Sequence, residues 1–127
     1  MAIKFKIIER GQPGVAGGGE KKFYANAVSS GEMTLTEMTK SIEKISTVSG
    51  ADIRAVLYAM VDVMKDGLAN GQIVRLGDLG SLRVSLSSNG EVDEKDVSSK
   101  TIKGSRTIFY PGKELRKTMD NLEFEKA

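Results

Sequence analysis

The first 28 residues read as two short β-strands joined by a loop. Residues 2–10 alternate between apolar and charged side chains, a period of two that is typical of a half-buried strand. A second strand is predicted over residues 21–28, with Phe23 and Ala25 on one face. Residues 11–20 contain Pro13 and five glycines, a composition that predicts a loop.

Two helices follow, because the apolar spacing changes to steps of three and four. Thr34 and Glu37 have the spacing of a capping box, and the helix that they begin is predicted to end near residue 46. Ser49 and Asp52 repeat this signal for a longer helix, which Asn70-Gly71 is predicted to terminate. The first apolar stripe is Leu35, Met38, Ile42 and Ile45; the second is Ile53, Val56, Leu57, Met60, Val61, Met64 and Leu68.

The second half of the chain predicts a β-hairpin and a final helix. Strands are expected over 73–76, 81–86 and 101–110, and the polar segment 87–100 between the last two contains Asn89-Gly90 as a hairpin signal. Pro111-Gly112 stops the last strand, and a short helix is expected over 113–122. Since strands and helices come in separate runs, the predicted fold class is α+β.

Composition excludes several classes of function. The 127 residues include no Cys and no His, which removes disulfides, thiolate nucleophiles, the usual zinc sites and imidazole bases. No run approaches the roughly 20 apolar residues of a membrane span, and residues 1–10 lack the apolar core of a signal peptide. We therefore expect an intracellular, cytoplasmic protein with no membrane association, and its net charge of +2 is only weak support for DNA binding.

Four features between Thr34 and Met119 resemble the superfamily of HU and integration host factor, which are histone-like DNA-binding proteins. They are the pair of helices with its link over 46–52, the strand-turn-strand over 71–82, the long hairpin arm, and the segment Phe109-Tyr110-Pro111-Gly112-Lys113-Glu114-Leu115. The last is similar to the family signature Phe-x-Pro-Gly-Lys-x-Leu and is the most specific. Residues 1–32 have no counterpart in ordinary HU, and such an extension resembles HU-related variants of Bacteroides-type bacteria.

The resemblance implies a single HU-like domain over 1–127: an extension over 1–32, a core over 33–122, and a β-arm over about 85–107. It further implies an intertwined homodimer whose paired arms reach around duplex DNA in the nucleoid. Binding would rest on phosphate and minor-groove contacts with little base readout. Leu79, Leu82 and Phe109 would belong to the dimer core. No cofactor, metal or small-molecule substrate is expected.

One basic cluster in the C-terminal half provides the candidate DNA-binding residues. A solvated surface is the ordinary interpretation of scattered charge, but the resemblance favours phosphate contact. The expected contacts are Lys100, Lys103, Arg106 and Lys113, followed by Arg83, Arg116 and Lys117.

The arm departs from the family pattern in two ways. Serines stand where arm arginines are expected, and the tip over residues 90–96 carries four acids, one lysine and no proline. Phosphates would repel that tip. An alternative function is therefore a structural or protein-interaction module that keeps the fold with little or no DNA binding.

Two further patterns favour ordinary structural roles over chemistry. The glycine-rich loop ends in Gly19-Glu20-Lys21 rather than the Gly-Lys-Ser/Thr of a phosphate-binding loop, so a flexible connection is expected. Asp62 and Asp66 lie one helical turn apart with no His or Cys beside them, which favours a solvated helix face. The sequence thus predicts a protein that is not an enzyme.

Overall fold

The structure is a computed structural model that describes all of residues 1–127. It has three α-helices and two small three-stranded sheets, which confirms the predicted mixed α+β class. The chain divides into two compact units, residues 1–38 with 118–127 and residues 39–117. The expectation of one HU-like domain with the boundaries given above stays a prediction.

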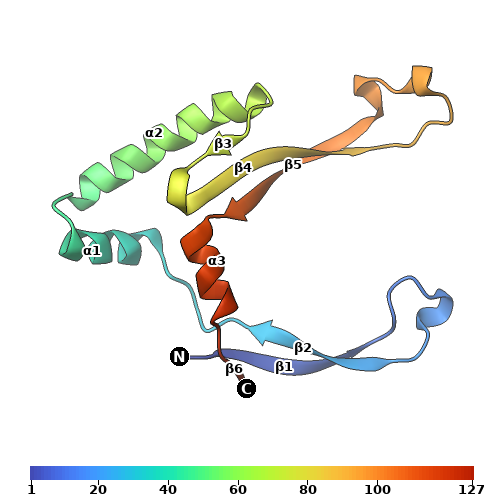
Figure 1. Cartoon of the computed structure of the whole chain (residues 1–127), viewed down its shortest axis with the longest axis horizontal. Coiled ribbons are helices and arrows are strands. Elements are labelled where there is room, and N and C mark those ends of the chain that lie inside the picture. The colour runs from blue at the N-terminus through green and yellow to red at the C-terminus, as the bar shows by residue number, and fades with distance from the viewer. The chain divides into compact units, whose positions relative to one another are not determined.

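The first unit contains the sheet β2-β1-β6 (Figure 1). β1 (Ile3–Arg10) pairs antiparallel with β2 (Lys22–Val28), and the loop between them contains a 3₁₀ turn at Ala16–Gly18. These two strands confirm the predicted ones. β6 (Phe124–Lys126), which the sequence did not predict, pairs parallel with β1. The Ile3 N–H donates to the Glu123 carbonyl at 2.8 Å, so the two ends of the chain meet in one sheet.

The two predicted helices begin at the predicted caps. The Thr34 hydroxyl accepts from the Glu37 N–H at 3.2 Å ahead of α1 (Leu35–Ile45), and Ser49 accepts from the Asp52 N–H at 3.2 Å ahead of α2 (Gly50–Ala69). α2 ends where Asn70-Gly71 predicted, with Gly71 at φ +76°. Neither α1, α2 nor α3 (Lys113–Asp120) is at once long enough and apolar enough to cross a bilayer.

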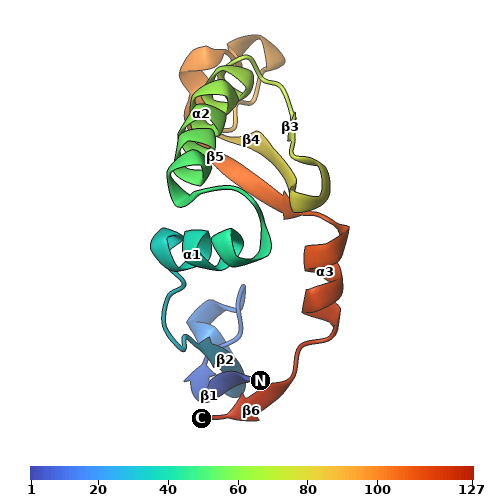
Figure 2. The ribbon, with the colours of Figure 1, turned by 90° about the vertical axis from the view of Figure 1, so that its left-hand side faces the viewer.

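The second unit contains the antiparallel sheet β3-β4-β5. β3 (Val74–Arg75), β4 (Gly80–Ser88) and β5 (Ile102–Pro111) lie at the predicted places, although β4 runs two residues beyond the predicted end. β3 lies beside the start of β4, and β4 and β5 then continue as a two-stranded ribbon, the arm (Figures 1 and 2).

The far end of the arm is longer than a tight hairpin turn. The Asn89 N–H donates to the Thr101 carbonyl at 2.8 Å, and the chain between them makes 3₁₀ turns at Glu94–Asp96 and Ser99–Thr101. Asn89-Gly90 therefore starts the tip but does not close the hairpin as a two-residue turn. At the base of the tip, Ser87 pairs with Gly104 and Ser88 with Ile102, which leaves Lys103 as an extra residue in a β-bulge.

The chain by itself has no apolar core. No hydrophobic side chain is buried, whereas Thr39 and Thr101 are only 1% and 7% exposed. The apolar stripes that the sequence predicts are present on the helices, but this chain alone does not cover them.

Candidate nucleic-acid interface

The β3-β4-β5 sheet has two unlike faces, because neighbouring residues on a strand point to opposite sides. The pairing puts Arg75 opposite Ser81, Arg83 opposite Ile108, and Arg106 opposite Ser85. These residues share one face, the polar face. The opposite face carries Val74, Leu82, Val84, Leu86 and Phe109.

Every charged residue on the three strands is basic. They are Arg75, Arg83, Lys103 and Arg106. None of the four takes part in an ion pair. The polar face is therefore a strip of unneutralised positive charge, with the short side chains of Ser81, Ser85 and Ser87 between the cations.

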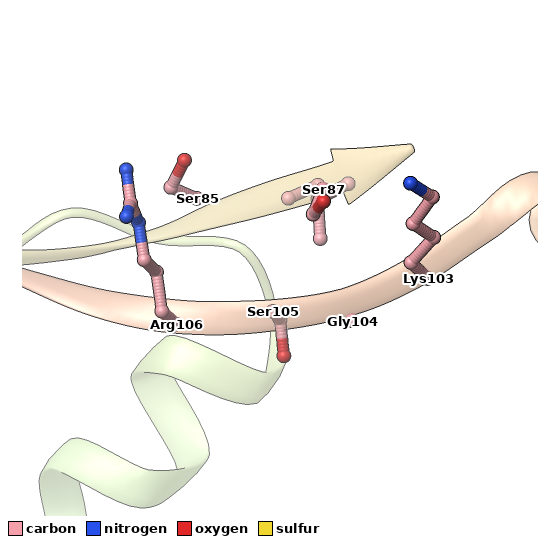
Figure 3. A pocket seen from close by; sticks show the side chains of 7 residues that line it. Ser85, Ser87, Lys103, Gly104, Ser105 and Arg106 are labelled. Atoms are coloured by element: carbon pink, nitrogen blue, oxygen red, sulfur yellow. The ribbon is translucent and has the colours of Figure 1, made fainter. Parts of the chain in front are cut away.

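The outer half of the polar face is a shallow hollow of about 480 Å³. Figure 3 shows Arg106, Ser85 and Lys103 projecting to the same side of the ribbon, whereas Ser105 points the other way. The bulge matters here because Lys103 has no partner on β4 and still joins this side. Gly104, which faces Ser87 and has open space around its Cα, leaves the strand backbone accessible between the two cations.

The inner half of the polar face is a second hollow of about 270 Å³. Its lining residues include Arg75, Arg83 and Tyr110. The Arg116 guanidinium carbon lies 5.5 Å from the centroid of the Tyr110 ring, which is cation–π distance. Arg116 thus extends the same positive surface from α3 onto the sheet.

The structure brings together four of the seven residues predicted from sequence: Arg83, Lys103, Arg106 and Arg116. Lys100 lies in the 3₁₀ turn Ser99–Thr101 at the tip, and Lys113 is the first residue of α3. Lys117 also lies on α3, where its ammonium is 3.7 Å from the Glu114 carboxylate. For all seven residues, contact with DNA stays a prediction.

Sequence reasoning did not include Arg75 among the candidate DNA-binding residues. Arg75 lies on the two-residue strand β3, and its position opposite Ser81 puts it beside Arg83. The available signal was that Arg75 lies in the strand predicted over residues 73–76. The arm serines, which stand where the family pattern would have arginines, occupy neutral positions on the same face as Arg83 and Arg106.

The tip of the arm has the opposite charge. Glu91, Asp93, Glu94 and Asp96 are exposed there, and Lys95 is the one cation among them. The Asp93 carboxylate accepts from the Lys95 N–H at 3.1 Å, so one acid also holds the 3₁₀ turn. The arm therefore changes from basic to acidic along its length.

Comparison with known families decides the relationship. A family model described as "HU domain fused to wHTH, Ig, or Glycine-rich motif", named HU-HIG, matches residues 1–126. The chain belongs to the HU-HIG family. This confirms the resemblance inferred from the four sequence features, and the family match includes the N-terminal strands that ordinary HU lacks.

A solved structure has the same fold as this HU-HIG chain. It is described as a "Putative bacterial DNA binding protein" from Bacteroides vulgatus, with a TM-score of 0.63 and 13% sequence identity. The match covers 98% of this chain and 48% of the other, so the HU-HIG chain spans about half the length of that relative. A search of curated proteins found no match.

Proposed function

We propose that this HU-HIG chain is a non-enzymatic architectural protein that binds duplex DNA with low sequence specificity in the nucleoid. The observation that carries the proposal is the polar face of the β3-β4-β5 sheet, on which every charged strand residue is basic and unpaired. Lys and Arg on such a strip neutralise phosphates and release counterions, a term that does not depend on base sequence. The family and the DNA-binding description of the solved relative agree with this.

The serines of the polar face suit a DNA backbone as ligand. Serine hydroxyls donate hydrogen bonds to phosphate oxygens, and their small size lets the duplex approach the ribbon. Arg83 and Arg106 lie on the same face, and arginine is one of the side chains with which proteins contact the minor groove. The acidic tip would stay away from the phosphates, so the base and middle of the arm bear the contacts.

We propose further that the binding unit is an intertwined homodimer of the HU type. α2 is apolar over a wide sector, yet Val56 and Val63 on it are 58% and 72% exposed. A helix with so much apolar surface is ordinarily buried. A second copy of the chain would cover α2 and the apolar face of the sheet, and it would place two arms on one duplex.

The acidic tip favours one alternative, a protein-interaction module on a retained HU fold. In that case the tip over residues 91–96 would be the recognition surface and the sheet would carry no DNA. The charge map of the dimer separates the two functions. A continuous positive saddle between the arms favours DNA, and a divided or acidic saddle favours the alternative.

The decisive test is a fluorescence-anisotropy titration of a random duplex of about 30 base pairs at several salt concentrations. The wild-type protein is expected to bind at micromolar concentration or tighter, with an affinity that falls steeply with salt. The variant Arg83→Gln/Lys103→Gln/Arg106→Gln should weaken binding to unrelated sequences alike, with a log–log salt slope shallower by about 2.7 if each residue contacts one phosphate. Affinity that is independent of salt would contradict the proposal, as would an effect confined to one sequence.

A further inference from the structure

The N-terminal sheet also has two unlike faces. Its apolar face forms a shallow hollow of about 330 Å³, lined by Ile3, Phe5, Ala25, Ala27 and Phe124. The alternation of β1 and β2 and the register between them assign the opposite face to Lys4, Lys6 and Arg10 of β1 and to Lys22 of β2. We call this opposite face the N-terminal basic face.

The cations of this sheet are concentrated on one face. The N-terminal basic face carries four cations and a single acid, Glu125, whose Cα pairs with that of Lys4 at the sheet edge. The opposite face carries one acid, Glu9, and one cation, Lys126, whose Cα pairs with that of Phe5. A face that merely meets water needs no such excess of one charge, because mixed charges keep it equally well solvated.

The four cations are available to a ligand. All four side chains are exposed, and none is in an ion pair. Lys4 and Lys6 are two residues apart on one strand, which spaces their Cα atoms by roughly 6.8 Å along the sheet. Near the hairpin loop, the Arg10 guanidinium carbon lies 5.3 Å from the centroid of the Tyr24 ring, so this cation is held over the face.

We propose that the N-terminal basic face is a second binding surface for the DNA phosphate backbone, separate from the arm. A row of unpaired cations along a two-stranded ribbon, with the one carboxylate at the sheet edge, has the charge that a polyanion requires. The extension would lengthen the stretch of duplex that each chain neutralises. This inference shares with the proposed function only the identity of the ligand, and it rests on different residues.

The experiment compares two triple variants that lower the net charge equally. Lys4→Gln/Lys6→Gln/Lys22→Gln removes three cations from the N-terminal basic face. Lys40→Gln/Lys44→Gln/Lys65→Gln removes three exposed lysines from α1 and α2 as the matched control. Both are titrated with the same duplex at several salt concentrations, and protection of the Ile3 amide from hydrogen exchange reports that the sheet is intact.

The N-terminal variant is expected to show a log–log salt slope shallower by up to about 2.7, whereas the control keeps the wild-type slope. Replacing the same three lysines with arginine should restore the slope, since arginine keeps the charge. Equal slopes for the Gln variant and its control would overturn the inference.

The two proposals fail separately. If the salt dependence of the affinity becomes shallower for the arm variant but not for the N-terminal variant, the proposed function stands and this inference is wrong. If the salt dependence becomes shallower only for the N-terminal variant, the extension is the DNA-binding surface and the assignment to the arm is wrong. A wild-type protein that does not bind duplex DNA at low salt overturns both.

Discussion

Two glycines hold the base of the arm together at the residue scale. The Gly112 N–H donates to the Leu79 carbonyl at 3.0 Å, and a Cβ on Gly112 would collide with the Asp78 carbonyl oxygen. Gly80 has φ +140°, and a Cβ there would collide with the Tyr110 carbonyl. The turn between β3 and β4 therefore packs backbone against backbone on the end of β5. This gives a physical reason for the glycine in the Pro-Gly-Lys signature.

We expect Gly112→Ala to destabilise the protein by about 1–3 kcal/mol, the usual cost of forcing extra atoms into a packed site. The obstacle is main chain, which no rotamer change can move. The measurement is urea unfolding followed by circular dichroism. Gly90→Ala is the matched control, because a Cβ at Gly90 meets nothing within 4 Å. Equal unfolding midpoints for the two variants would show that the close approach at Gly112 does not exist in solution.

Features that depend only on neighbouring residues could be predicted from the sequence. The helix starts were correct because a cap needs only neighbouring residues, as with Ser49 and Asp52. The bulge at Lys103 was not foreseen, since it depends on how β4 and β5 pair across the whole arm. The sequence identified Lys103 as a basic residue of the arm. That it projects to the same side as Arg106 is visible only in the structure (Figure 3).

At the scale of elements, both sheets concentrate their cations on one face. Strand alternation predicted the amphipathic character of β1 and β4, and the hairpin signal predicted that β4 pairs with β5, but nothing local predicted β6 as a partner of β1. β6 shows the limit most clearly. Its three residues have no periodicity of their own, and their strand geometry comes from pairing with β1 at the other end of the chain. A partner more than 110 positions away leaves no local signal.

Removing β6 tests this long-range pairing. A chain truncated after Asn121 loses the Glu123 carbonyl that accepts from the Ile3 N–H. Since an amide without its partner opens more readily, the Ile3 amide should exchange with solvent far faster. Amides of β4 and β5, which belong to the other unit, serve as the internal control and should keep their protection. Unchanged protection of Ile3 would mean that β6 does not pair with β1 in solution.

At the scale of the whole molecule, the main feature to explain is that no hydrophobic side chain is buried. Exposed apolar side chains occur on all three helices and on both sheets, and the buried side chains of the chain are two threonines. Burial of apolar surface is the main favourable term in folding. Because no hydrophobic side chain of the chain is buried, we expect folding and association to be one event.

This expectation has a direct test in the mass and concentration dependence of the protein. Light scattering should give twice the chain mass of 13.7 kDa, and a tenfold rise in concentration should raise the apparent stability by about 1.4 kcal/mol because association is linked to folding. Val56→Asn, on the exposed apolar sector of α2, should lower the unfolding midpoint and favour the monomer. Lys65→Asn, on the same helix in a solvent-exposed ion pair with Asp62, is the control and should change little. A monomeric mass with an unfolding midpoint independent of concentration would contradict the homodimer, and the positive face of each arm would then have to bind DNA as a single ribbon.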